Sequence, residues 1–134
     1  MINIIGIEHV AIAANRSEKS RFFFEKILGI DFINSESIDE QGVITEIFDA
    51  KNGKIELLKP INNESKISNF LKKRGAGLHH ICFEVENIVE SITHLKNNNI
   101  ELIGDNYSIG AEGYKVVFIH PKSTGGILVE LAEK

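Results

Sequence analysis

Two similar stretches, separated by about half the length of the chain, constrain its fold more than any other feature of the sequence. One begins at His9 and continues Val-Ala-Ile, and the other begins at His80 and continues Ile-Cys-Phe. Each alternates as a half-buried strand does, and a helix-like segment follows each at once. We therefore predict two similar modules in one fold, with a histidine at the equivalent place in each. Such a pair is a candidate metal site at a pseudo-twofold axis.

The residues around these stretches predict the order β-α-β-β-β twice, which is an α+β fold. Capping residues, glycines and hairpin signals set the boundaries. We expect one domain over 1–134, with module one at about 4–60, a linker helix at about 61–76 and module two at about 77–134. The expected strands lie at about 5–14, 30–33, 43–48, 54–59, 79–85, 100–103, 114–120 and 127–132, with turns or loops at 35–41 and 107–113.

Composition limits the class of protein. The net charge of −4 argues against a general nucleic-acid binder, and no apolar run approaches the roughly 20 residues of a membrane span. The first residues lack a basic segment and a cleavage site, so we expect no signal peptide. The single cysteine, Cys82, fits a reducing compartment and reads as a small core residue. We expect a cytoplasmic protein without a membrane or nucleic-acid partner.

Each module ends in an apolar strand that a glutamate interrupts, Glu56 in the first and Glu130 in the second. A buried charge is costly unless it is paired or binds a metal. Together with His9 and His80, these carboxylates suit a divalent ion such as Co, Mn, Ni, Fe or Zn better than calcium. Each residue alone is more often a core or solvated side chain, but four at repeat-related positions favour a metal site. His79 is a rival ligand, although alternation turns it away and the repeat favours His80.

Further stretches carry a family likeness: Glu8–Ile12, Glu40–Val43, Ile55–Pro60, Phe70–Gly75, Gly77–Ile81, Gly110–Gly113, His120–Gly126 and Val129–Leu131. On these, residues 7–133 resemble the vicinal oxygen chelate superfamily of glyoxalases, bleomycin resistance proteins and dioxygenases, and within it the methylmalonyl-CoA epimerases. The two histidines and the glutamate are common to the superfamily and are weakly specific. The turn at 120–126 together with Leu78-His79-His80-Ile81 is more specific to the epimerases.

The resemblance implies paired β-α-β-β-β modules whose curved mixed sheets surround a metal cleft. It implies that His9, His80 and Glu130 are metal ligands, and that Glu56 stands where the family has a Glu or Gln that completes the set. The implied reaction interconverts the C2 epimers of methylmalonyl-CoA, an acyl-CoA substrate, with a divalent Co, Mn, Ni or Zn ion as cofactor. Relatives form dimers, so we expect a homodimer.

Epimerisation next to a thioester needs two acid–base groups on opposite faces of an enolate, and a cation beside the enolate oxygen. Glu130 is the first candidate base, because the corresponding glutamate of the family is both ligand and base. Some epimerases carry a second glutamate just after the Glu-Gln-Gly turn. Counting from Glu40 without a gap reaches Thr45, and Glu46 is one position further, which in a strand means the opposite face. Glu46 is therefore either the second base or a solvated side chain.

Two further segments are candidate substrate contacts. The backbone at Lys122, Ser123 and Thr124, leading into Gly125-Gly126, is either an ordinary hairpin or a nest of N–H groups for the free carboxylate of the substrate. The basic run at 72–74 either receives CoA phosphates or, more often for such a run, ends a helix favourably.

Two other functions remain open for such a chain. A glyoxalase I-type lactoylglutathione lyase, or another enzyme of the superfamily, uses the same ligands and an enolate-like state, and fold and ligand set do not separate the two. A metal-free drug-binding protein of the bleomycin-resistance kind uses the cleft for capture alone. The intact His9, His80 and Glu130 argue against the drug-binding protein, and the turn at 120–126 favours the epimerase.

Overall fold

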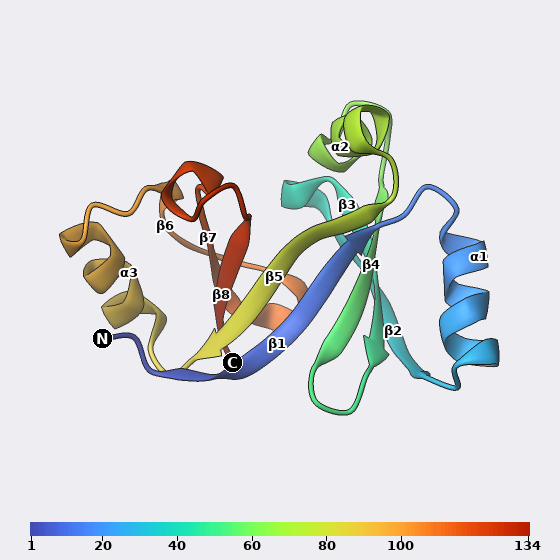
Figure 1. The fold of residues 1–134 in the computed structure, drawn as a ribbon, viewed down its shortest axis with the longest axis horizontal. Coiled ribbons are helices and arrows are strands. Elements are labelled where there is room, and N and C mark those ends of the chain that lie inside the picture. Colours follow the sequence, from blue (N-terminus) through green and yellow to red (C-terminus); the bar gives the residue numbers. More distant parts are fainter. The chain divides into compact units, whose positions relative to one another are not determined.

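The order β-α-β-β-β occurs twice along the chain, as predicted (Figure 1). The computed structural model describes residues 1–134. None of its helices combines the length and the apolar character that a membrane crossing requires. The first set is β1 (Ile4–Ala13), α1 (Ser17–Phe22) with a π-helical continuation (Phe23–Ile27), β2 (Asp31–Ile38), β3 (Val43–Asp49) and β4 (Lys54–Pro60). After α2 (Lys66–Arg74) come β5 (Gly77–Val85), α3 (Ile88–Asn97), β6 (Leu102–Ile109), β7 (Lys115–Ile119) and β8 (Val129–Glu133).

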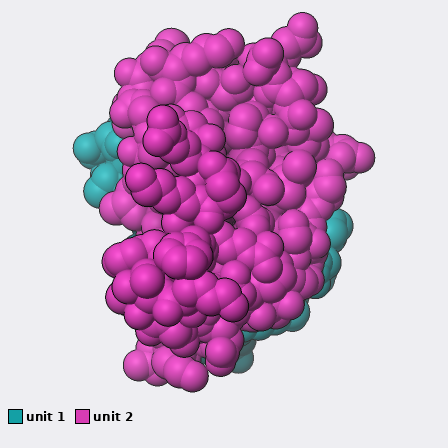
Figure 2. Space-filling model, turned by 90° about the vertical axis from the view of Figure 1, so that its right-hand side faces the viewer, with its two compact units in different colours: residues 1–9, 80–134 teal, residues 10–79 magenta.

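The chain divides into two compact units, which Figure 2 shows in different colours. Unit 1 contains residues 1–9 and 80–134, and unit 2 contains residues 10–79. Strand β1 passes from unit 1 into unit 2 after His9, and β5 passes back between His79 and His80. The module boundaries expected from the sequence stay a prediction.

Unit 2 is built on the strand order β2-β3-β4-β1. Strand β3 runs antiparallel to both β2 and β4, and its register with β4 pairs Glu46 with Leu57 and Ile47 with Glu56. Because opposed residues share a face and neighbours alternate, these two pairs lie on opposite faces of the sheet. The face of Leu57 packs against Phe24, which follows α1. The other face carries a second apolar cluster that includes Ile67 of α2.

Unit 1 has the strand order β1-β5-β8-β7-β6, in which β5 and β8 are parallel while β8, β7 and β6 are antiparallel. Helix α3 begins where the Asn87 side chain accepts a hydrogen bond from the backbone N–H of Glu90, at 3.0 Å. Its apolar side covers one face of this sheet. The buried residues of that core are Val85, Ile88, Ile92, Leu95, Val117, Ile119 and Leu131. Alternation along β8 therefore turns Glu130, the neighbour of Leu131, to the face away from α3.

Two strands are longer than predicted. Strand β2 continues to Ile38 through a segment that the sequence indicates as a turn, and β6 extends to Ile109 in place of ending near residue 103. Both lie at the outer end of the strand order, where most of their side chains are exposed. Backbone hydrogen bonds to β3 and β7 pair them with the sheet. Because their side chains are mostly polar, their sequences lack the alternation of apolar residues that predicts a strand.

Candidate functional site

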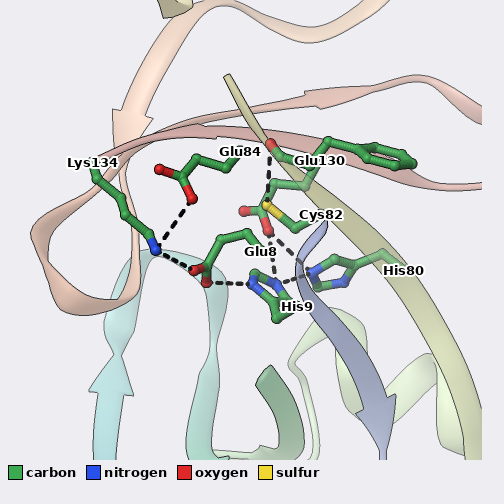
Figure 3. A network of polar contacts seen from close by, with 8 residues as sticks. Glu8, His9, His80, Cys82, Glu84, Glu130 and Lys134 are labelled. Carbon is green, nitrogen blue, oxygen red and sulfur yellow. Dashed lines mark hydrogen bonds and ion pairs between the residues drawn. The ribbon is translucent and has the colours of Figure 1, made fainter. Parts of the chain in front are cut away.

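Three buried donor atoms meet on the face of unit 1 that lies away from α3 (Figure 3). His9 comes from β1, His80 from β5 and Glu130 from β8. The two imidazole Nε2 atoms lie 3.1 Å apart, and Glu130 Oε1 lies 3.1 Å from the first and 3.2 Å from the second. The structure thus brings together His9, His80 and Glu130 of the predicted ligands.

The sheet holds these side chains in place. Strands β5 and β8 are paired in parallel with Cys82 opposite Glu130, so His80, two residues before Cys82, shares the face of Glu130. The ring of Phe118 meets the His80 ring edge-on, with centroids 5.1 Å apart. The neighbouring His79 belongs to unit 2 and stacks edge-on against Phe70 instead, at 4.9 Å. Alternation thus separates the two histidines, as the sequence predicts.

The donor set fits a divalent metal ion. Atoms about 2.1 Å from one ion and at right angles to each other lie about 3 Å apart, which the three measured distances match. Glu130 Oε1 is buried and receives no hydrogen bond of good geometry, although two nitrogens approach it. Lone pairs this close attract only with a proton or a cation between them. Two imidazoles and a carboxylate suit a transition-metal ion.

The surroundings also keep Glu130 ionised. Burial is the largest single influence and raises the pKa of this carboxyl, but the two imidazoles beside it, His80 and His9, together lower it by more. The net result lowers the pKa of Glu130 to about 2. A carboxylate that stays charged at neutral pH suits a metal ligand.

Two residues beside the donors were not among the predicted site residues. A carboxylate oxygen of Glu8 lies 3.1 Å from His9 Nδ1, and Cys82 Sγ lies within 4.8 Å of donor atoms of His9 and Glu130. Strand alternation places Glu8 on the face opposite His9, so sequence reasoning passed over it. A carboxylate immediately before an expected ligand histidine was the available signal. Cys82 also packs with Val116 and Ala132, in keeping with the expected core role.

The two predicted site glutamates of unit 2 lie on opposite faces of its sheet. Glu46 is buried and pairs with Arg21 of α1 at 3.2 Å and with Lys59 of β4 at 3.4 Å. Glu56 is buried on the other face, together with Thr45. Glu46 is therefore not a solvated side chain, and its role as the second base stays a prediction. Two cations, Arg21 and Lys59, hold its carboxylate on the face opposite Glu56.

The turn at 120–126 uses its own polar groups. The N–H groups of Lys122, Ser123 and Thr124 donate to His120 and Pro121. The Ser123 hydroxyl accepts from the backbone N–H of Glu101 at 2.9 Å, the Lys122 ammonium pairs with the Glu101 carboxylate, and the Thr124 hydroxyl bonds within the turn. The expected anion nest therefore lacks free donors at 122, 123 and 124, because these N–H groups already donate within the turn.

Comparisons with known proteins agree with this fold and donor set. A family model of the glyoxalase/bleomycin resistance protein/dioxygenase superfamily matches residues 8–118. The mitochondrial methylmalonyl-CoA epimerase of Homo sapiens is 41% identical over 98% of this chain and 75% of its own length. That of Dictyostelium discoideum is 42% identical over 98% of this chain and 84% of its own length.

Solved structures give the same answer. The crystal structure of methylmalonyl-CoA epimerase from Mycobacterium tuberculosis superposes with a TM-score of 0.94 and 27% identity, covering 99% of this chain and 90% of that one. The sequence match and the fold match both extend over nearly the whole chain. The chain therefore belongs to the glyoxalase/bleomycin resistance protein/dioxygenase superfamily and, within it, to the family of the methylmalonyl-CoA epimerases.

Proposed function

We propose that this protein interconverts (R)- and (S)-methylmalonyl-CoA by removing the C2 proton and returning it through an enolate. The observation that carries the proposal is the triangle of His9, His80 and Glu130 in a chain similar to these epimerases over almost its full length. The similarity favours this reaction over the lactoylglutathione lyase and the drug-binding protein, because the relatives and the superposed structure are named as epimerases.

In this proposal His9, His80 and Glu130 hold a divalent ion, and Glu56 stays a ligand predicted from the sequence alone. A bound divalent ion supplies Lewis-acid stabilisation of the developing enolate oxygen. Co, Mn, Ni and Zn all suit these nitrogen and oxygen donors, so metal analysis of the purified protein identifies the one bound. Both imidazoles are buried, and the ring of Phe118 packs edge-on against that of His80.

Proton transfer is assigned to Glu130 on one face of the substrate. Its pKa of about 2 keeps it ionised, which supports the ligand role more strongly than the base role, since a general base works best with a pKa near the operating pH. For the second proton carrier, Glu46 stays the candidate predicted from the sequence. Its ion pairs with Arg21 and Lys59, on the sheet face opposite Glu56, count against this role.

The proposed homodimer and cytoplasmic location are additional expectations. The segment after α1 exposes large apolar side chains, with Phe23, Ile27 and Leu28 each about half exposed or more. Surfaces of this kind are typical of protein contacts. Light scattering of the purified protein measures the state directly, and a monomer would contradict the dimer.

The function is tested by the stereochemical outcome. Incubation of the cobalt-loaded protein with pure (S)-methylmalonyl-CoA is expected to yield an equal mixture of epimers, measured by chiral analysis of the acyl group. Ethylmalonyl-CoA and the hemithioacetal of methylglyoxal with glutathione serve as competing substrates. Unchanged optical purity together with turnover of the hemithioacetal would replace the epimerase with the glyoxalase I-type reaction.

A further inference from the structure

Glu8 is a buried carboxylate to which the proposed reaction assigns no role. Its side chain is only 3% exposed, and it lies on β1 directly before His9. One oxygen, Oε1, lies 3.1 Å from His9 Nδ1, and the other, Oε2, lies 3.2 Å from the Lys134 ammonium. Figure 3 shows the carboxylate lying between these two partners. A carboxylate so buried is stable only with such partners.

The imidazole of His9 is therefore held from both ring nitrogens. Nδ1 faces Glu8, while Nε2 faces Glu130 and His80. A carboxylate is an acceptor only, so a hydrogen bond at this position requires that His9 Nδ1 carries the hydrogen. In the neutral imidazole the lone pair then lies on Nε2, on the side of the other two donors.

Lys134 fixes the carboxylate on its far side. Its ammonium lies 3.2 Å from both Glu8 and Glu84, so it bridges a carboxylate of β1 and one of β5. The Lys134 side chain is 42% exposed, whereas Glu8 is almost fully covered. Lys134 thus supplies the counter-charge that burial of Glu8 demands, and Glu84 pairs with the same ammonium.

We infer that Glu8 is a positioning residue for the metal centre, which accepts the Nδ1–H of His9 and so presents the His9 Nε2 lone pair to the ion. The inference rests on the proposed function, because it assumes that His9 is a metal ligand. Glu8 neither ligates the ion nor meets the substrate in this account. Loss of carboxylates that orient ligand histidines typically weakens metal binding 10–100-fold.

A purely structural role is the rival explanation. In that case the ion pair of Glu8 with Lys134 only joins β1 to the end of β8. The contact of Glu8 with His9 then has no influence on the His9 ring. The two explanations differ in which replacement restores metal binding. A glutamine at position 8 keeps an acceptor for the His9 Nδ1–H and loses the charge that pairs with Lys134, whereas an alanine loses both.

The test compares Glu8→Ala, Glu8→Gln and the control Glu84→Ala with the wild-type protein. Cobalt affinity is measured by titration, and the tautomer of His9 is read from long-range ¹H–¹⁵N spectra of the metal-free proteins. Assignment uses a His9→Gln variant. We expect hydrogen on Nδ1 in the wild type, a 10–100-fold loss of cobalt affinity and loss of that tautomer in Glu8→Ala. Glu8→Gln should recover most of both, and Glu84→Ala should bind cobalt within about twofold of the wild type.

Other results would overturn the inference. Unchanged affinity or an unchanged His9 tautomer in Glu8→Ala contradicts it, and so does a Glu8→Gln variant as weak as Glu8→Ala. Failure of the proposed function looks different. A wild-type protein that fails to bind cobalt contradicts both the proposed function and this inference. A wild-type protein that binds cobalt without epimerising the substrate contradicts the proposed function alone, and the cobalt affinities of the variants still test the role of Glu8.

Discussion

At the scale of single residues, the centre is defined by how a glutamate stays charged between two imidazoles. The folded-state pKa of Glu130 is about 2, below the ordinary value of 4.5. A carboxyl whose pKa is depressed by folding stabilises the protein above its unfolded pKa. That stabilisation is lost as the pH falls from about 4.5 to about 2, because the unfolded chain takes up the proton first.

This predicts a specific difference between the metal-free wild type and Glu130→Gln. The shift corresponds to a contribution of about 3 kcal/mol at neutral pH. Urea unfolding at pH 7 and pH 3 should show the wild-type free energy of unfolding falling by more than that of the variant. Equal losses in the two proteins would show that the histidines do not hold the charge of Glu130.

Replacing Glu46 tests whether its two cations mark a structural or a catalytic group. Because the carboxylate is held by Arg21 and Lys59 on the face away from Glu56, we expect Glu46→Gln to keep epimerase activity within about threefold and to lose about 1 kcal/mol of stability. Steady-state kinetics and thermal melts measure both, with Glu130→Gln as the inactive comparison. A loss of activity of 10²-fold or more, with stability intact, would restore Glu46 as the second base.

At the scale of elements, the helical segment after β1 forms as predicted, but it buries fewer of its apolar side chains than their spacing suggests. Phe23, Phe24, Ile27 and Leu28 stand at helical spacing in the sequence. In the structure Phe24 packs into the core of unit 2 against Phe48, whereas the other three are about half exposed or more. The π-helical turn at Phe23–Ile27 winds differently from an α-helix, so spacing on a 3.6-residue period misplaces the other side chains.

The contrast between two adjacent phenylalanines measures this orientation. We expect Phe24→Ala to lose about 2 kcal/mol of unfolding free energy, because its ring fills space against Phe48. Phe23→Ala, whose side chain is 48% exposed, should change the stability of the monomer by about 0.5 kcal/mol or less. Chemical denaturation at low protein concentration measures both free energies. A larger loss in Phe23→Ala than in Phe24→Ala would mean that Phe23, and not Phe24, fills the core.

Much of the element order was predictable, and the reason lies in where the apolar residues stand. Strands β1, β3, β4, β5 and β8 carry buried apolar residues, and their alternation and repeat located them together with His9, His80 and Glu130. The ends of β2 and β6 were not predictable, because most of their side chains are exposed and give no alternating apolar pattern. The contact of Glu8 with His9 also escaped prediction, since it runs against strand alternation.

At the scale of the whole molecule, binding of a metal to the folded state alone must stabilise it. At a free cobalt concentration 100 times the dissociation constant, the expected gain is about 2.7 kcal/mol. Melting curves with and without cobalt measure the gain in the wild type, and His80→Ala should abolish it. The gain should also shrink in acid, because protons compete with the metal for its ligands. An equal gain in His80→Ala would place the ion elsewhere.

The reaction proposed for this centre is removal of the proton at C2 of methylmalonyl-CoA. Its most direct test follows one epimer in D₂O with the cobalt-loaded protein and monitors the C2 proton by NMR. We predict rapid loss of the C2 proton signal together with loss of optical purity, and no exchange with Glu130→Gln. A persistent C2 signal with metal bound would contradict the account and assign the centre to another reaction.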